Sequence, residues 1–374
     1  MRKLRKKNPM KLPPSTLALL VTLACTAAQV RAEGVPLFGQ SLDGASVFAH
    51  TYATTGANST VTGDIVSGDV ATMGAASLLS GNLLSLGAAT IGANAVVRGN
   101  MVSGGAGTTG DTSWVGGDVR AGGAATIGAN ANVAGKVEAL GAVTLSASST
   151  IHGAGTLSAL PLLGAIPTNV QSNAQQIGAA QAALKNMGQG TALGTTMTLD
   201  TTLYPGVFSA ANLSTTAGIT LTLDGQNRPN QSWVFNIDDY LVTGAAMKIV
   251  LINADASNSV IWNSGGYASL GASGEFIGTV LAKDYVSVGA GTSVTGVGSA
   301  CGGIFSATSY VSTGDGARIG GNGCSGTGSG FDIVDGTAVR SIGIPAVPEP
   351  SSYAMLVAGL TLLGLKRQRK LARR

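Results

Sequence analysis

Side chains able to do acid–base, nucleophilic or metal chemistry are scarce in this sequence. Its two histidines, His50 and His152, belong to no HExxH motif and lie at no ligand-like spacing from a cysteine. Asp238 and Asp239 form the only adjacent acidic pair of the chain body, but neighbouring strand residues point to opposite faces, so the two carboxylates need not converge. We therefore interpret them as surface charges and expect no catalytic residue, no metal site and no cofactor.

A column of threonines is the most regular feature of the chain. Six segments, each starting 18 residues after the last, share one pattern: ATTGANSTVTG from Ala53, ATMGAASLLSG from Ala71, ATIGANAVVRG from Ala89, GTTGDTSWVGG from Gly107, ATIGANANVAG from Ala125 and VTLSASSTIHG from Val143. Threonine is second in every segment: Thr54, Thr72, Thr90, Thr108, Thr126 and Thr144. Glycine is eleventh in every segment: Gly63, Gly81, Gly99, Gly117, Gly135 and Gly153.

Repeated hydroxyl and methyl groups at one spacing suit an ordered water lattice. The hydroxyls can join a hydrogen-bond network and the methyl groups can occupy its gaps. Simple β-propensity is the alternative explanation, because threonine favours strands. It predicts threonine mixed with Val, Ser and Ile, rather than threonine at one position in all six segments.

This period requires a repetitive fold. Glycine at a fixed phase predicts a corner with an unusual backbone angle, and the apolar positions must stack inward because no single coil can bury them alone. We predict an all-β fold in the main, a parallel β-solenoid whose 18-residue coils have three short sides and stack about 4.7–4.9 Å apart. Asn58, Asn94 and Asn130, sixth in their segments, lie near a corner, where they would contribute to a binding face or cap the turn.

The second half begins with a change of pattern. Residues 168–190 place Val170, Ala174, Ile177, Leu184 and Met187 on one stripe, which predicts an amphipathic helix that packs along the solenoid. Its start would be capped by Thr168, Asn169 or Ser172, and its end by Gly188 or Gly190.

Strands are expected again from about residue 197, at 219–225, 232–238 and 248–254. The coil pattern returns from Ala268, Val286 and Val311, which places Ser269, Ser287 and Ser312 at the phase of the threonines. The last step is 25 residues and indicates a small excursion, closed by a Cys301–Cys324 disulfide. Residues 327–346, with the glycine-rich GTGSGFD at 326–332, are interpreted as a linker.

Both ends of the chain have the features of sorting signals. Residues 1–32 combine a basic stretch, an apolar run and a V-x-A site, which predicts a secretory signal peptide cleaved before Glu33. Lipid attachment at Cys25 is the weaker alternative. At 347–374, VPEPSS, the apolar run YAMLVAGLTLLGL and KRQRK resemble the PEP-CTERM sorting signal of Gram-negative bacteria. That resemblance implies transient inner-membrane retention by a short transmembrane segment, processing by an exosortase-type peptidase, and delivery to the cell surface or outside; a plain tail anchor is the alternative.

The charge of the chain argues against nucleic acid as a partner. Thirteen of the 22 Lys and Arg residues lie within 2–31 and 366–374, where there are no acids. The nine basic residues between them face all 18 acids, so the body carries a net charge near −9 and would repel phosphates.

Several segments resemble the ice-binding protein-like family of secreted solenoids. They are LYPGVFSA at 203–210, LTLDGQNRPNQSWVFNIDDYLVT at 221–243, residues 247–296 with GTVLA at 278–282, and LDGASVFAHTYATTGANSTVTGDI at 42–65. The resemblance covers residues 42–321 and implies a right-handed β-solenoid with one helix alongside, and adsorption to ice through one flat face. Two features depart from the family. The first half is longer and more regular, and Asn258 stands where many members have a cysteine, so the disulfide would differ.

We therefore expect residues 33–326 to form a non-enzymatic, exported ice-binding domain, with regular coils over 53–160, the helix at 168–190 and further coils over 197–326. The expected partner is ice or an ordered water surface, bound by the six threonines together with Ser269, Ser287 and Ser312. The alternative is a structural or adhesive protein of the extracellular matrix, with extracellular polysaccharide as its partner. A β-helix enzyme acting on carbohydrate is a more distant one.

Overall fold

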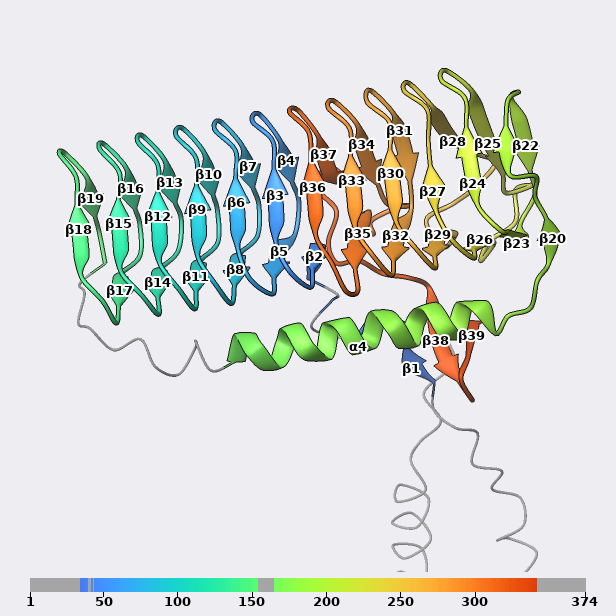
Figure 1. The fold of residues 1–374 in the computed structure, drawn as a ribbon. Helices are drawn as coiled ribbons and strands as arrows, with labels where there is room; N and C mark the ends of the chain where they lie inside the picture. The colour runs from blue at the N-terminus through green and yellow to red at the C-terminus, as the bar shows by residue number, and fades with distance from the viewer. Residues whose placement is uncertain (1–33, 40–41, 43, 154–164, 342–374) are drawn as a thin grey trace, which may run out of the picture. The chain divides into compact units, whose positions relative to one another are not determined.

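In the computed structural model, the described residues are 34–39, 42, 44–153 and 165–341. They form three parallel sheets of twelve strands each, one helix and one small antiparallel sheet. Each coil contributes one short strand to each parallel sheet, so the solenoid has three sides (Figure 1). The predicted solenoid is confirmed.

We name the parallel sheets by what lies on their outer faces. The threonine sheet contains, in spatial order, β18 (Val143–Leu145), β15 (Ala125–Ile127), β12 (Gly107–Thr109), β9 (Ala89–Ile91), β6 (Ala71–Met73), β3 (Ala53–Thr55), β36 (Val311–Thr313), β33 (Val286–Val288), β30 (Ala268–Leu270), β27 (Leu241–Val242), β24 (Leu213–Thr215) and β21 (Thr196–Met197).

The helix sheet contains β17 (Val137–Ala139), β14 (Val119–Ala121), β11 (Met101–Ser103), β8 (Leu83–Ser85), β5 (Asp64–Ser67), β2 (Ala45–Ala49), β35 (Gly303–Ser306), β32 (Thr279–Ala282), β29 (Ser259–Ser264), β26 (Ser232–Ile237), β23 (Gly206–Ala210) and β20 (Thr191–Ala192). The third sheet is also all parallel, and we name it the mixed sheet because its outward side chains are of several types. It contains β19 (Thr150–Ile151), β16 (Asn132–Val133), β13 (Trp114–Val115), β10 (Val96–Val97), β7 (Leu78–Leu79), β4 (Thr60–Val61), β37 (Arg318–Gly320), β34 (Ser293–Thr295), β31 (Glu275–Ile277), β28 (Lys248–Ile252), β25 (Thr220–Asp224) and β22 (Thr201–Leu203).

The order of the coils in space differs from their order in the chain. The first six coils extend from the middle of the stack to one end, and α4 (Ala165–Lys185) then runs back along the helix sheet (Figure 1). The remaining coils start at the other end and return to the middle. As a result, β2, β3 and β4 of the first coil pair with β35, β36 and β37 of the last.

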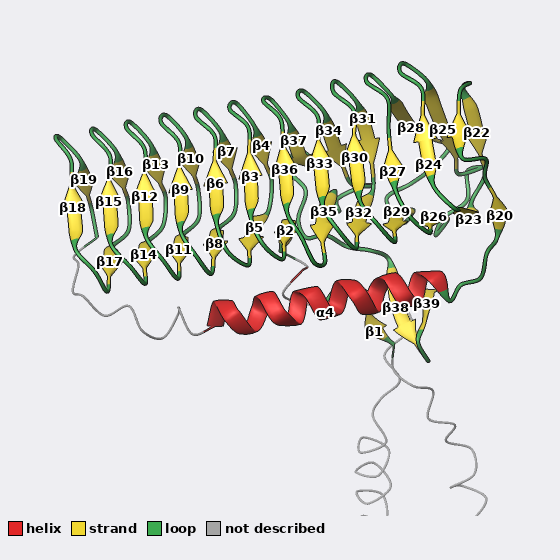
Figure 2. Ribbon diagram, viewed as in Figure 1, coloured by secondary structure: helices red, strands yellow, loops and turns green. Residues whose placement is uncertain are grey.

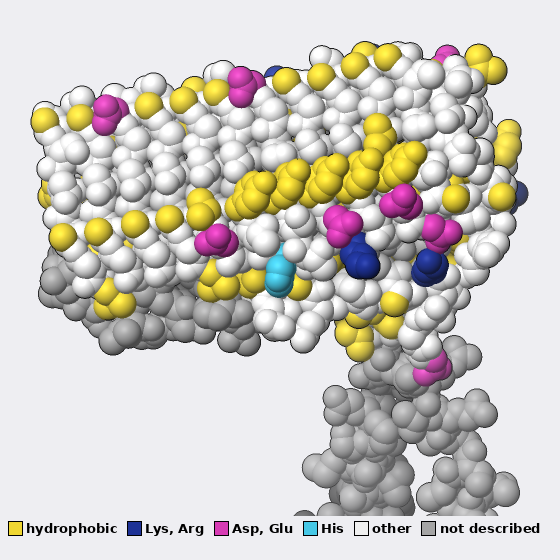
Figure 3. Space-filling view, in the orientation of Figure 1, with side chains coloured by type: hydrophobic (Ala, Val, Ile, Leu, Met, Phe, Trp, Pro, Cys, Tyr) yellow, Lys and Arg dark blue, Asp and Glu magenta, His cyan; other side chains and the backbone are white. Residues whose placement is uncertain are grey.

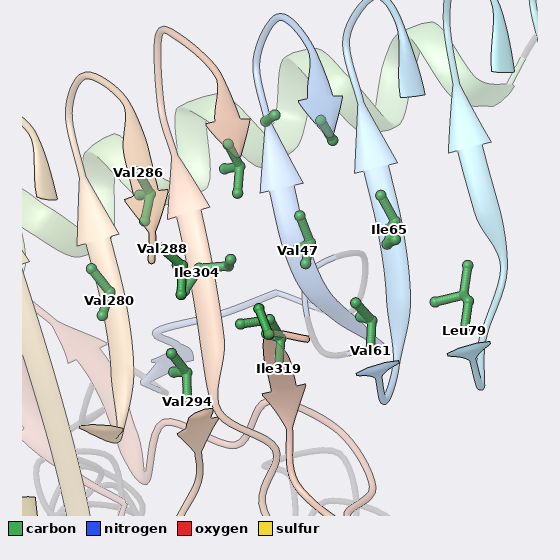
Figure 4. Close-up of a cluster of buried hydrophobic side chains, with 14 of the residues drawn as sticks. Val47, Val61, Ile65, Leu79, Val280, Val286, Val288, Val294, Ile304 and Ile319 are labelled. Carbon is green, nitrogen blue, oxygen red and sulfur yellow. The ribbon is translucent and has the colours of Figure 1, made fainter. Parts of the chain in front are cut away.

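The core is a thin column of inward side chains that runs through both halves. Val47, Val61 and Ile65 from the first coils lie beside Ile304 and Ile319 from the last (Figure 4). Small residues occupy much of the inner side of the regular coils, whereas the wider coils near the other end are filled by a stack of Phe208, Phe235, Trp262 and Phe276.

The glycine column fits a corner, but for a different reason from the one predicted. Only Gly63 of the six has a left-handed φ, of 105°. At Gly99 an added Cβ would lie 2.6 Å from the carbonyl oxygen of Gly81, so glycine is required there by the close approach of the preceding coil. The left-handed conformation occurs instead at the sixth residue of each segment, with φ of 56–58° at Asn58, Ala76, Asn94, Thr112, Asn130 and Ser148.

A ladder of side-chain hydrogen bonds fixes the next corner of the regular coils. The backbone N–H of Asn82 donates to Oδ1 of Asp64 at 2.7 Å, and that of Asn100 donates to Oδ1 of Asn82 at 2.9 Å. The same bond continues from Asp118 N–H to Asn100, and from Lys136 N–H to Asp118. Burial outweighs these bonds at Asp64 and raises the pKa of its carboxyl above 3.8.

The predicted amphipathic helix is present, with a different start. α4 begins at Ala165, before each of the expected caps Thr168, Asn169 and Ser172. Its apolar stripe packs on the outward residues of the helix sheet, where Val66, Phe48 and Phe305 are buried. Beyond its last turn, Gly188 N–H donates to the carbonyl of Lys185, with φ of 92° at Gly188.

Residues 327–346 were expected to be a linker, and the described part of this segment contradicts that. β38 (Phe331–Val334) and β39 (Thr337–Arg340) form a hairpin that pairs with β1 (Val35–Pro36), and this small sheet lies beside α4 (Figure 2). This segment has few large apolar residues, but Phe331 is only 1% exposed and packs in the apolar cluster beside α4. Cys301 and Cys324 form the predicted disulfide.

Within the described residues, no helix is long and apolar enough to cross a membrane. The predicted signal peptide at 1–32 and the predicted transmembrane segment at 353–365 lie outside these residues.

Candidate functional site

The six threonines occupy one position on the outer side of the threonine sheet. In β15, for example, Ala125 and Ile127 are fully buried and Thr126 between them is partly exposed, because alternate strand residues face opposite sides. Thr126 pairs with Thr108 on one side and with Thr144 on the other. All six therefore line up across adjacent strands, one coil apart.

The column continues without a break into the second half of the chain. Thr54 pairs with Ser312, which is followed by Ser287 and Ser269, so the three predicted serines lie on the threonine line. Val242, Ser214 and Thr196 complete it. The sequence reasoning missed these three, because they are separated by coils of unequal length rather than by a constant period.

The hydroxyl groups of the six threonines are turned to solvent. Among the described residues, those of Thr54, Thr72, Thr90, Thr108, Thr126 and Thr144 have no hydrogen-bond partner in the protein. Thr55 and Thr109, by contrast, face inward and accept backbone N–H groups. The outer hydroxyls are thus free to bond to water, and in β3, β6, β9, β12 and β15 the residues on either side of the threonine are buried.

The other two sheets do not offer such a surface. α4 covers much of the helix sheet, where Asn236 donates to the carbonyl of Leu184 at 2.8 Å. The mixed sheet carries bulky and charged residues at its outward positions, with Trp114 in one coil and the Lys248–Glu275 ion pair elsewhere. The threonine sheet is the side that is uncovered and has one repeated residue type.

A second outward column lies two residues before the first and differs between the halves. In five of the six regular coils it is small and apolar: Val70, Ala88, Ala106, Ala124 and Ala142. In the first coil and four coils of the second half it consists of Tyr52, Tyr310, Tyr285, Tyr267 and Tyr240. Figure 3 shows the tyrosines as a prominent band that continues as a line of small apolar side chains. Small uncharged residues therefore accompany the threonines in these five regular coils, from Thr72 to Thr144.

The asparagines near the corner have a structural explanation. Asn58, Asn94 and Asn130 hold the left-handed turn at the edge of the threonine sheet, a conformation that asparagine adopts more readily than most residues.

Asp238, interpreted as a surface charge, is 2.9 Å from Nζ of Lys185, and both side chains are mostly exposed. No three His, Cys, Asp or Glu side chains come together as metal ligands in the part of the chain that the structure describes.

Fold and surface together define a parallel β-solenoid with one uncovered, uncharged row of hydroxyl and methyl groups. Residues 153–312 match the family described as Ice-binding-like, and residues 346–370 match the PEP-CTERM protein-sorting motif. Residues 153–312 are thus similar to the Ice-binding-like family, in line with the sequence resemblance, and all six threonines precede the matched region.

Three relatives have related sequences. Ice-binding protein 1 of Shewanella frigidimarina (strain NCIMB 400) is 38% identical over 96 residues, 25% of this chain and 11% of that protein. The ice-binding protein of Nostoc sp. (strain HG1) is 38% identical over 93 residues, 25% of this chain and 34% of that protein. That of Colwellia sp. is 33% identical over 109 residues, 28% of this chain and 41% of that protein. The chain thus spans less than half the length of each.

Two solved structures are also similar. The DUF3494 domain of the Shewanella frigidimarina protein has a TM-score of 0.45 at 21% identity, over 77% of this chain and 97% of that one. The ice-binding protein of the Antarctic ascomycete Antarctomyces psychrotrophicus has a TM-score of 0.41 at 17% identity, over 77% and 98% of the two chains.

Proposed function

We propose that this protein adsorbs to ice through the outer side of the threonine sheet, without catalysing a reaction. The observation that carries the proposal is the row Thr54, Thr72, Thr90, Thr108, Thr126 and Thr144, whose hydroxyls are unpaired and whose strands are paired in unbroken register. Ser312, Ser287 and Ser269 extend the row.

The geometry suits a crystalline water surface for two reasons. The hydroxyls repeat once per coil, at the spacing of paired strands, so several can join one ordered layer of water at the same time. Each contact is weak, but a rigid strip loses little conformational freedom on binding, so the contacts add up. A flat strip of small side chains is needed for this, and the regular coils provide it best.

We further propose that the protein is exported and sorted before it acts. Support comes from the N-terminal pattern of a signal peptide and from the PEP-CTERM match at 346–370, which implies processing by an exosortase-type peptidase in a Gram-negative cell and retention at the inner membrane before release. At the cell surface the threonine sheet would attach cells to ice, and outside the cell it would slow recrystallisation.

The experiment is a recrystallisation assay with the purified protein at micromolar concentration. Ice grains in a frozen sucrose solution should stay small, and single crystals should become faceted. If grain growth matches that of a buffer control, and the protein instead binds to isolated matrix or biofilm material, the structural or adhesive function takes the place of ice binding.

A further inference from the structure

A ridge of five stacked tyrosines stands beside the serine part of the threonine column. We name Tyr240, Tyr267, Tyr285, Tyr310 and Tyr52 the tyrosine ridge. Successive ring centroids are 5.4, 4.8, 5.0 and 4.7 Å apart, and neighbouring rings are within 17° of parallel. The ridge is straight because each ring lies one coil from the next.

Stacking alone would stabilise these coils. Phenylalanine would serve that purpose equally well, yet every position is a tyrosine. In the described residues, no hydrogen bond links any of the five hydroxyls to the protein. The row therefore presents five groups that can each donate and accept a hydrogen bond.

The rings of the ridge cover each other's faces, so a ligand meets their edges and hydroxyls. On one side of the ridge are the hydroxyls of Ser269, Ser287 and Ser312, two residues further along each strand. On the other side are the exposed carboxylates of Asp239 and Asp284, which directly precede Tyr240 and Tyr285. Burial among its neighbours raises the pKa of Tyr285, so its hydroxyl keeps its proton at neutral pH.

This surface excludes several partners. A peptide strand cannot add to the sheet here, because each ridge strand is already paired on both sides. The exposed charges that adjoin the ridge in sequence are Asp239, Asp284 and Lys283, and their net negative charge disfavours an anionic polymer or membrane. The rings of the ridge repeat at 4.7–5.4 Å between centroids, a spacing that matches the rise per sugar of an extended β-linked glycan. The hydroxyls of such a glycan also both donate and accept hydrogen bonds.

We propose that the tyrosine ridge is a binding site for an extended, neutral polysaccharide. The phenol hydroxyls and the serines hydrogen-bond to the sugar hydroxyls, the aspartates accept further bonds, and the ring edges contact the sugar C–H groups. The ridge lies mainly on coils of the second half, and Thr72, Thr90, Thr108, Thr126 and Thr144 lie beyond it. The two proposed sites share Ser269, Ser287 and Ser312, so a glycan on the ridge would still leave these five threonines uncovered.

The test is retention of the full-length protein on microcrystalline cellulose, followed by titration with cellohexaose. The test variant is Tyr267→Phe/Tyr285→Phe/Tyr310→Phe, which preserves the ring stack and removes three hydroxyls. We expect the wild type to be retained and the variant to bind at least about tenfold more weakly, with an unchanged circular dichroism spectrum. Thr90→Tyr/Thr126→Tyr, which alters only the proposed ice site, should bind cellulose as the wild type does.

Three outcomes would overturn the proposal. They are no retention of the wild type on cellulose, equal binding by the phenylalanine variant, and retention on the acidic polysaccharide alginate that matches that on cellulose. None of them bears on ice binding, because the recrystallisation assay contains no polysaccharide.

Discussion

Thr54 lies directly opposite Ser312 on adjacent parallel strands, so the first coil of the chain stacks on the last. This pair joins two runs of hydroxyls that the chain makes separately, one in the regular coils and one in the second half. The joined line is longer than either half alone could provide. Its two parts differ in their surroundings, because alanines accompany most of the threonines and tyrosines accompany the serines.

The glycine corners should tolerate no side chain. In Gly99→Ala the new Cβ would lie 2.6 Å from both the Gly81 carbonyl oxygen and Asn82 Oδ1, so adjacent coils must separate. We expect a loss of about 1–3 kcal/mol in the free energy of unfolding, measured by urea denaturation. Gly178→Ala is the matched control, because Gly178 lies within α4 with nothing near its added Cβ, and it should gain about 0.5–1 kcal/mol. Equal effects at the two sites would refute close coil contact.

Asp64 should make stability depend on pH. Its pKa is higher in the folded protein than the ordinary 3.8, so its stabilising contribution is present below that value and is lost as the pH rises. Asp64→Asn keeps the acceptor for the Asn82 N–H and should be more stable than the wild type near neutral pH. The difference in stability between the two proteins should shrink as the solution is acidified.

Asp224 should make stability depend on pH in the opposite direction to Asp64. Hydrogen bonds from Gln226 N–H and the Asn253 side chain lower its pKa, so its contribution is present above the ordinary value and is lost in acid. Asp224→Asn should be the less stable protein near neutral pH. Thermal unfolding of both variants at several pH values measures the two effects, and the same sign for both would contradict the assignment.

The disulfide should stabilise the junction between the two halves. Cys301 and Cys324 are 23 positions apart, and the loop they close contains the strands of the last coil. Loop-closure entropy predicts a contribution of about 3 kcal/mol. Cys301→Ser/Cys324→Ser should unfold at a lower urea concentration than the wild type in the absence of reductant. An unchanged midpoint would show that the junction is held by strand pairing alone.

The sequence predicted the regular coils because their period is constant. Each coil must place its apolar residues inward and its threonine outward, so the repeat itself indicates which residues align. The position of Val242 and Ser214 on the same line could not be found in this way, because their coils have other lengths. The pairing of β3 with β36 also cannot be predicted from the repeat, because it depends on where the chain returns after α4.

Two local features differ from what the sequence predicted. The constant phase of glycine predicts a special backbone angle, whereas most of these glycines serve close coil contact. The segment 327–346 looked like a linker, although Phe331 and the pairing of β38 with β39 order it. The tyrosine ridge did leave a signal, because Tyr267, Tyr285 and Tyr310 each precede their serine by two residues.

The most direct test of the central claim is whether fluorescently labelled protein binds to the surface of a single ice crystal. Thr90→Tyr/Thr126→Tyr places two rings on the threonine sheet, and the matched control Thr60→Tyr/Thr150→Tyr places them on the mixed sheet of the same solenoid. The wild type and the control should coat the crystal, and the threonine-sheet variant should remain in solution while folding normally. Binding by the threonine-sheet variant, or absence of binding by the wild type, would contradict the assignment of this face.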